Sequence, residues 1–303
     1  MHNILILIDT IGEKKESLAT YLAKYIPDCN VSMARFTDLV YEVDGKDVKL
    51  FVSGIDKDIT FFDLVYIRRA GKRFSISASS AAVCMKHLGI KFFDTSFENI
   101  GPIGSKFTLY LRLSVAGFPT IPSFFCFQEK IKDYRKHVIE KFGLPLVAKD
   151  LQLERGQGVF LIKNEQDFED LPKKIENEKG HEFMFQKFVK SDEEYRILVL
   201  GDRIGAFEEK IRTDPNEFRN NVALGAREVF HDINKIPQML KEIAINSAKE
   251  LNTQIAGVDI SIDKKGTPWL LEVNRGPGLT YDPKISPELA NIAKFFASQL
   301  SND

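Results

Sequence analysis

The sequence predicts a mixed α/β (α+β) protein, and two observations carry that prediction. The first third of the chain alternates apolar, strand-like runs with helical patterns, which is typical of a small open α/β domain. The last third contains GVDISIDKKGTPWLLEVN at 257–274, which predicts two antiparallel strands around a polar turn that contains Gly266. A chain of 303 residues has room for two domains, or for three small lobes wrapped together.

The strands of the first third are continuous apolar runs, and its first helix carries Leu18, Leu22 and Tyr25 at helical spacing. The expected elements, in order, are strand 3–8, helix 16–25, strand 31–36, a hairpin around 44–45, strand 64–67, helix 75–88 and strand 91–93. The opening apolar run is too short to span a bilayer and lacks the basic flank and cleavage site of a signal peptide. We therefore expect a buried first strand.

The most basic cluster in the chain, RRAGKR at 68–73, directly follows strand 64–67. Open α/β sheets bind ligands at the carboxyl ends of their strands, so Arg69 is a candidate to clamp a carboxylate or a phosphate of the substrate. The alternative is a solvated loop whose charges serve solubility.

The middle of the chain begins with a polar, glycine-containing link at 99–105. The elements expected after it are helix 106–116, strand 124–127, helix 129–142, strands 145–149 and 159–162, helix 164–179 and strand 182–189. Gly156 and Gly158 flank Gln157 before a strand, whereas the dinucleotide-binding fingerprint is followed by a helix. A loop between two antiparallel strands instead predicts a lid that lays backbone N–H groups on phosphates.

In the last third, a strand that begins at Glu194 turns at Gly201-Asp202. The elements expected beyond that turn are strand 204–210, helix 234–251, strands 257–263 and 269–274, and helix 286–300. The two helices have amphipathic stripes and are expected to pack on the core.

A metal site is predicted on the final pair of strands. Pairing Asp263 with Pro268 across the turn places Asp259 opposite Glu272, with Asn274 on the same face. Two carboxylates and an amide oxygen, without His or Cys beside them, suit a hard ion such as Mg²⁺ that shares its shell with phosphate oxygens. The alternative is a half-buried hairpin with a polar face.

Strict alternation puts Trp269, Leu271 and Val273 on the opposite face of the second strand. The strand runs into Arg275-Gly276-Pro277-Gly278, a turn in which Gly276 and Gly278 allow the backbone to approach a substrate closely. Arg275 is expected to face phosphate.

Composition excludes several classes of function. Lys and Arg number 42 against 43 for Asp and Glu, so no bulk charge argues for nucleic acid or a membrane surface. Cys29, Cys84 and Cys126 are widely spaced and are expected to be buried or idle thiols of a reducing, cytoplasmic compartment. The five histidines are equally scattered, so a zinc site and a Cys-His or Ser-His nucleophile lack support.

Several motifs occur together in one order. The stretch GVD at 257–259, EVN at 272–274 and PG at 277–278 resembles the metal site of ATP-grasp enzymes. NEFRNN at 216–221, followed by Gly225, resembles the loop of the RimK-type branch of that family, in which a second glycine stands where this chain has Ala226. The resemblance covers about 100–280 and implies an ATP-grasp fold behind an N-terminal open α/β domain.

The resemblance also assigns roles to residues. It implies Mg²⁺ on Asp259, Glu272 and Asn274, with two ions expected and Mn²⁺ able to substitute. It implies that ATP is bound by Lys106, Lys149, Gly156, Gly158, Gln186, Lys187, Val189 and Glu194, the adenine meeting the backbone of 187–189. Families usually have Gln-Glu where this chain has Gln186-Lys187. The substrate is expected to meet Arg69, Arg196, Gly276 and Gly278.

Catalytic roles are implied for Arg219 and Asn221, near the transferred phosphate and the acceptor. Lys210 and Arg212 lie two residues apart on one strand and both remain candidates for the cation that stabilises the acyl phosphate and the oxyanion. The domains implied are an N-terminal α/β domain at 1–98, a small lobe with the glycine-rich lid at 99–189, and a C-terminal lobe with the magnesium site at 190–303.

The reaction implied is ATP-dependent joining of a carboxylate to an amine through an acyl phosphate, with release of ADP and phosphate. A RimK-like enzyme would add an amino acid such as glutamate to a peptide, a protein tail or a small amine. The alternatives are a ligase of small molecules, like glutathione synthetase or D-alanine-D-alanine ligase, and a nucleotide-binding module without turnover. No nucleic acid or membrane partner is expected, and two exposed helical lobes could support a homo-oligomer.

Overall fold

The structure is a computed structural model that describes residues 2–44, 47–71, 73–98, 106–153, 158–171, 181–214 and 225–300. The strands are β1 (His2–Ile8), β2 (Cys29–Arg35), β3 (Leu39–Asp44), β4 (Asp47–Val52), β5 (Lys57–Asp58), β6 (Leu64–Ile67), β7 (Phe92–Phe93), β8 (Ser123–Phe127), β9 (Leu146–Asp150), β10 (Val159–Ile162), β11 (Glu182–Lys187), β12 (Ser191–Leu200), β13 (Arg203–Ile211), β14 (Arg227–His231), β15 (Ile255–Asp263) and β16 (Pro268–Arg275). The helices are α1 (Glu13–Tyr25), α2 (Ser75–His87), α3 (Lys106–Val115), α4 (Ile131–Phe142), α5 (Glu165–Asp170), α6 (Gln238–Glu250) and α7 (Glu288–Leu300).

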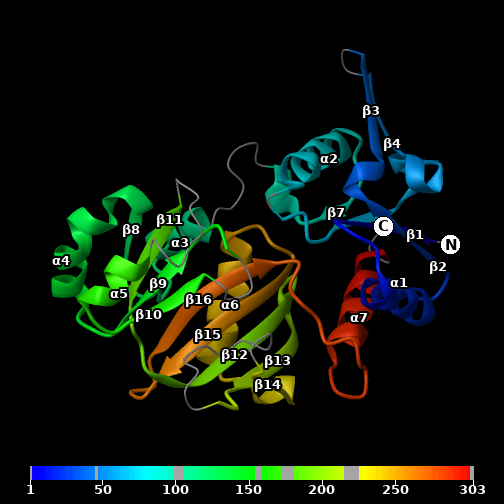
Figure 1. The fold of residues 1–303 in the computed structure, drawn as a ribbon. Coiled ribbons are helices and arrows are strands. Elements are labelled where there is room, and N and C mark those ends of the chain that lie inside the picture. The colour runs from blue at the N-terminus through cyan, green and yellow to red at the C-terminus, as the bar shows by residue number, and fades with distance from the viewer. Residues whose placement is uncertain are drawn as a thin grey trace.

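The N-terminal part is the expected open α/β domain. Its parallel sheet has the strand order β2-β1-β6-β7, and a smaller sheet, β3-β4-β5, projects from it as a hairpin (Figure 1). Apolar side chains alternate between the two faces of β1, with Ile4 and Ile6 on one face and Leu5 and Leu7 on the other. Helices α1 and α7 cover the first face, and α2 covers the second.

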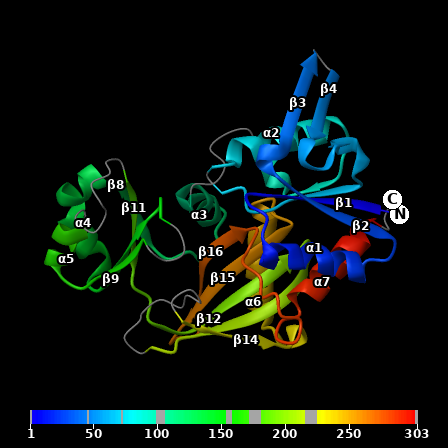
Figure 2. The same ribbon diagram turned by 45° about the vertical axis from the view of Figure 1, so that its right-hand side comes forward.

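The middle of the chain forms a small lobe that stands apart in both ribbon views (Figures 1 and 2). Its sheet has the order β10-β9-β11-β8 and is antiparallel where β9 meets its two neighbours. Helices α4 and α5 supply the side chains that pack with this sheet around the buried Phe183 and Phe185. The prediction of a helix at 164–179 is confirmed over 165–170, and 172–180 lie outside the described residues.

The central sheet has the order β14-β13-β12-β15-β16, and α6 covers one of its faces. The other face packs with α7 through Leu198 and Leu200, and its polar part carries the candidate site. Strand β14 was not expected from the sequence. Helix α6 begins at Gln238, later than expected, because Pro237 is its N-cap and a short 3₁₀ turn occupies Ile233–Lys235.

The pairing of the last two strands was predicted correctly at the site and wrongly at the turn. Asp259 does lie opposite Glu272, but Pro268 pairs with Ile262 and not with Asp263. A bulge between Asp259 and Ile260 takes up the difference of one residue. In consequence Leu270, and not Leu271, is buried in the core with Val273, so strict alternation along this strand was also wrong.

The N-terminal domain and the central sheet share one hydrophobic core. Helix α7 contributes Phe296, which is fully buried and packs edge-on against Tyr66 of β6. The same cluster includes Leu198 and Leu200 of β12. Both ends of the chain therefore help to hold the face of the central sheet that carries the candidate site against the N-terminal domain. In the described part of the chain, no helix is long and apolar enough to cross a bilayer.

Candidate active site

A row of charged residues crosses four strands on the polar face of the central sheet. Glu208 of β13 lies opposite Arg196 of β12, Arg196 opposite Asp259 of β15, and Asp259 opposite Glu272 of β16. Directly paired residues share a face, so the four side chains point to the same side of the sheet. Lys210 is two residues beyond Glu208 and points the same way.

Asp259 is the hub of this row. It is 5% exposed, and Arg196 donates to both of its oxygens, from Nε to Oδ1 (2.9 Å) and from Nη2 to Oδ2 (2.8 Å). Lys210 Nζ donates to Oδ1 (3.0 Å) and lies 3.4 Å from Glu194 Oε1. Burial alone would raise the pKa of Asp259, but Arg196 and Lys210 hold that pKa far below its usual range. The carboxylate is therefore ionised throughout the neutral range.

The predicted ligand set fits a magnesium ion by its chemistry. Asn274 Nδ2 donates to Asp259 Oδ2 (3.2 Å), which leaves the amide oxygen of Asn274 for an ion, and Glu272 is half-buried beside it. Asp259 is already bound by two cationic side chains, so it would be shared between them and the ion. Among the described residues no three acidic, His or Cys side chains gather closely enough to bind a metal by themselves.

Lys149, at the end of β9, brings the small lobe to this site. Burial lowers its pKa, and the nearby carboxylates of Glu272, Glu194 and Asp259 oppose that effect. These charge interactions place the lysine near the carboxylates of the central sheet. The small lobe thus brings a positive charge close to the row of charged residues on that sheet.

The other small-lobe residues expected to hold the nucleotide are placed as follows. Lys106 Nζ donates to the carbonyl of Leu153 (2.9 Å), at the start of the glycine-rich loop. Gly158 packs so closely that a Cβ there would lie 2.9 Å from the carbonyl oxygen of Asp150. Gly156 lies outside the described residues.

At the expected adenine hinge, Gln186 is buried, and its Nε2 donates to Ser123 Oγ (2.9 Å), so its side chain joins β11 to β8. The N–H of Lys187 donates to the carbonyl of Pro122 (3.2 Å). In this antiparallel pair the opposing residue would normally donate in return, but Pro122 has no N–H. The Lys187 carbonyl is therefore left without its usual ladder donor. Val189 follows β11 and is half-buried.

The N-terminal domain reaches the site through the loop after β6. Arg69 has a left-handed backbone (φ 54°) and lies against the turn that follows the predicted metal ligands. A Cβ at Gly276 would be 2.9 Å from the Arg69 nitrogen, and one at Gly278 would be 3.4 Å from Arg69 Nη2. The buried Arg68 fastens the contact, because its Nη2 donates to the carbonyl of Pro277 (3.2 Å). Gly276 is needed for this close approach, whereas a Cβ at Gly278 would make an ordinary contact with the flexible end of the Arg69 side chain.

The expectation that Arg275 faces phosphate was wrong. Its guanidinium lies over the ring of Phe97 (4.8 Å to the centroid) and 3.4 Å from Ser96 Oγ. It also interacts with the charge of the fully buried Asp94, so it joins the N-terminal domain to the end of β16. The cause is the alternation along β16, which turns Arg275 away from the face of Asn274.

Of the two candidates for the catalytic cation, Lys210 lies at the hub and Arg212 does not. Arg212 Nη2 donates to the carbonyl of Ser191 (2.8 Å), at the edge of the sheet. Arg219 and Asn221 lie outside the described residues.

Sequence reasoning missed a set of acidic residues beside the hub. Glu208 and Glu288 are buried, and Glu228 of β14 accepts a hydrogen bond from Thr280 Oγ1 (2.8 Å). The one available signal in the sequence was the spacing of Glu208 and Lys210, because residues two apart on a strand point to the same face. Glu228 and Glu288 lie on elements whose approach to β13 no local pattern predicts.

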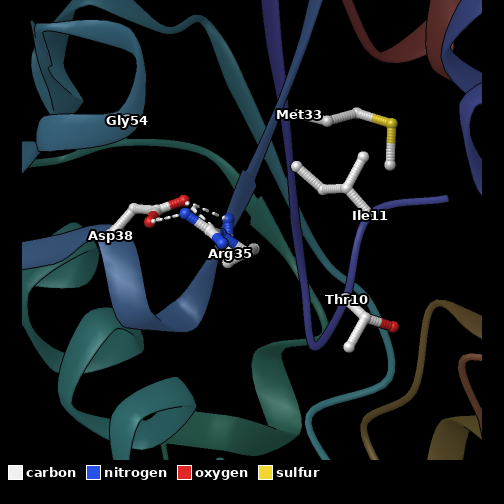
Figure 3. A pocket seen from close by; sticks show the side chains of 6 residues that line it. All are labelled: Thr10, Ile11, Met33, Arg35, Asp38 and Gly54. Carbon is white, nitrogen blue, oxygen red and sulfur yellow. Dashed lines mark hydrogen bonds and ion pairs between the residues drawn. The ribbon is translucent and has the colours of Figure 1, made fainter.

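A separate pocket of about 350 Å³ opens at the carboxyl ends of β1 and β2. Met33 and Ile11 line one wall of the pocket, and Arg35 and Asp38 lie side by side on the opposite wall (Figure 3). Arg35 Nη2 donates to Asp38 Oδ1 (2.9 Å), so its charge is already paired. Strand β1 lies between β2 and β6, so β1 separates this pocket from the loop after β6 that carries Arg69.

Comparison with known proteins agrees with this geometry. Over 155 residues the chain is 30% identical to a probable alpha-L-glutamate ligase of Cellvibrio japonicus, a match covering 50% of each protein. Over 139 residues it is 32% identical to the ribosomal protein bS6--L-glutamate ligase of Escherichia coli, covering 45% of this chain and 44% of that protein. The chain thus spans about half the length of the curated relatives it matches.

The fold is similar to that of the ATP-grasp ligase PsnB, solved with a phosphomimetic variant of its minimal precursor, Mg and ADP. The two superpose with a TM-score of 0.71 at 14% identity, covering 98% of each chain. This likeness confirms the predicted ATP-grasp fold. A family profile described as the RimK-like ATP-grasp domain matches residues 123–294, more than half of the chain. The chain therefore belongs to the RimK-like ATP-grasp family.

Proposed function

We propose that the chain is an ATP-dependent carboxylate–amine ligase that forms an amide bond through an acyl phosphate. The observation that carries the proposal is the meeting of three parts of the chain beside the predicted metal ligands. Lys149 of the small lobe lies near the carboxylates of the central sheet, and Arg69 of the N-terminal domain lies on the turn that follows Asn274. Family membership supports the same reaction class.

In this proposal Mg²⁺ on Glu272, Asn274 and Asp259 neutralises the phosphates of ATP and orients the transferred group. A pair of ions is expected, and Mn²⁺ is expected to substitute. Lys149 and Lys106 bind the α- and β-phosphates, and the lid that contains Gly156 and Gly158 keeps water away. The Lys187 carbonyl accepts from the adenine amino group, and the Val189 N–H donates to the ring.

Lys210 is proposed as the cation beside the reacting carbonyl, since it is buried and fixed to Asp259. Arg196 holds Asp259 in place, and Glu194 holds Lys210. Arg69 is proposed to bind the carboxylate substrate, since it lies against Gly276 and Gly278 at the edge of the site. Arg219 and Asn221 remain candidates for the acceptor side.

We propose an amino acid such as glutamate as one substrate and a peptide or protein tail as the other. The names of the relatives support this choice, since one acts on ribosomal protein bS6 and the fold neighbour was solved with a minimal precursor. A ligase of two small molecules is the second candidate. The domains proposed are 1–98, 99–189 and 190–303.

The test is release of phosphate from Mg-ATP in the presence of single amino acids, amino-acid pairs and short peptides, with mass spectrometry of every active mixture. A product with the mass of two substrates less one water, absent with Glu272→Ala, supports the ligase. Activity with peptides but not with free amino acids selects the first candidate. Binding of ATP without turnover on any mixture rejects both.

A further inference from the structure

Glu208 is a buried acid that the proposed roles leave unused. It is 3% exposed, and its Oε1 has no hydrogen-bond partner among the residues that the structure describes. Burial raises its pKa to about 8, and the charges of Arg196 and Lys210 only partly offset that effect. A buried carboxyl oxygen without a partner is costly, so the presence of Oε1 on this face calls for a ligand.

The cations near Glu208 are directed elsewhere. Arg196 lies directly opposite it on β12 but gives two hydrogen bonds to Asp259. Lys210 lies two residues along β13 and contacts Asp259 and Glu194. Neither cation forms an ion pair with Glu208 in the described structure. The positive charge of this region is therefore used on the metal side, and Glu208 is left without a bonded cation among the described residues.

Glu228 supplies a second carboxylate on that side. It is the direct partner of Lys210 across β13 and β14, which places it diagonal to Glu208 on the same face. Its Oε2 accepts from Thr280 Oγ1 (2.8 Å), and the Thr280 N–H donates to Glu288 Oε2 (2.7 Å). Glu228 is thus held in position by the segment that follows the Pro277-Gly278 turn.

We infer that Glu208 and Glu228 bind the ammonium group of the amine substrate. An ammonium has three N–H donors and no acceptor, and its positive charge lowers the pKa of Glu208 when it binds. The ionised Glu208 then accepts its hydrogen bonds together with Glu228. Glu208 lies two strands from Asp259, on the order of 10 Å between Cα atoms, and Glu228 lies one strand further. A primary amine held there is within one side chain's length of the carbonyl that Lys210 would stabilise.

The inference rests on the proposed ligase activity and concerns only the amine half of the reaction. The two halves can be separated, because hydroxylamine is largely uncharged at neutral pH and traps an acyl phosphate as a hydroxamate without needing an ammonium site. The enzyme is given Mg-ATP, the active carboxylate and either hydroxylamine or the standard amino acids and short peptides as amines. Hydroxamate reports the first half-reaction, and amide reports both.

Glu208→Gln keeps the size of the side chain and removes the charge. We expect it to raise the KM for the amine by about 10- to 100-fold while the rate of hydroxamate formation stays within about two-fold. Glu228→Gln should act in the same direction, and Glu208→Asp should recover part of the affinity. The matched control is Glu209→Gln, because Glu209 is the next residue, faces the other way and pairs with His231 on the surface.

An unchanged KM for the amine in Glu208→Gln would overturn the ammonium site. So would an equal loss of hydroxamate and amide in both Glu208→Gln and Glu208→Asp, since that pattern means that Glu208 supports the metal side or the fold. If the wild-type protein forms no hydroxamate from any carboxylate, the proposed ligase activity itself fails, which is a different result from either of these.

Discussion

At the residue scale, the contacts of Asp259 distinguish two candidates for the catalytic cation that the sequence leaves equivalent. Lys210 and Arg212 are two residues apart, but β13 ends at Ile211, and of the two only Lys210 bonds to Asp259. We expect Lys210→Gln to lower kcat by about 100-fold or more, because it removes a fixed positive charge from the reacting centre. Arg212→Gln should change kcat by less than about three-fold. Steady-state kinetics, with ADP affinity as the check on folding, decides between them, and equal losses would reject the assignment.

A second residue-scale prediction concerns the buried Asp94, whose Oδ1 accepts from the Gln254 N–H (2.9 Å). Burial raises its pKa from 3.8 to about 7, against the opposing charge of Arg275. The folded state therefore binds more protons than the unfolded state between those values, and stability falls as pH rises through that window. Glu208 and Glu288 act in the same direction.

The side chain introduced by Asp94→Asn cannot ionise. As the pH rises from about 4.5 to about 7.5, the melting temperature of this variant should therefore fall less than that of the wild-type protein. Thermal unfolding across that range measures the difference. A steeper fall in the variant would mean that Asp94 is ionised beside Arg275 in the folded protein. Asn at this position keeps the acceptor for Gln254, so loss of that hydrogen bond would not explain the outcome.

At the element scale, the β15–β16 pair shows what sequence can and cannot predict. Alternation and turn length identified both strands and brought Asp259 opposite Glu272, because a sheet face repeats every two residues. The bulge that moves Leu270 into the core was not predictable. Thr120 of a distant segment bridges to Leu270, and the Leu270 N–H donates to the carbonyl of Pro119 (2.8 Å). Such a contact depends on the tertiary fold.

The close approach of the turn to β15 gives a prediction at this scale. A Cβ at Gly257 would lie 2.7 Å from Pro277 Cβ, so Gly257→Ala must push the turn away from the sheet. We expect it to cost about 1–3 kcal/mol of stability and to weaken the carboxylate site at Arg69. Gly12→Ala is the control, because Gly12 has an extended backbone and a Cβ added there would have no atom within 4 Å. Adding Pro277→Gly should restore part of the lost stability, and no restoration would contradict the steric account.

At the scale of the whole molecule, one buried cluster joins the N-terminal domain to the central sheet, whereas the small lobe has a cluster of its own. The sequence predicted a helix near the C-terminus but not its partners, because amphipathicity says that a face is buried and not against what. Helix α7 packs on α1 and shares a core with β1, β6 and β12, whereas the small lobe has a separate core around Phe183 and Phe185.

Two truncations of core side chains should therefore destabilise different sets of strands. Phe296→Ala and Phe183→Ala each remove a fully buried ring and should each cost about 3–5 kcal/mol. In hydrogen exchange, Phe296→Ala should lower protection in β1, β6 and β12 together, because these strands share its cluster. Phe183→Ala should lower it only between β8 and β11. Loss of protection in the central sheet with Phe183→Ala would contradict this prediction, because it would show that the lobes unfold as one unit. Independent opening of the small lobe matters for the proposed function, because a nucleotide bound between the small lobe and the central sheet needs a way in.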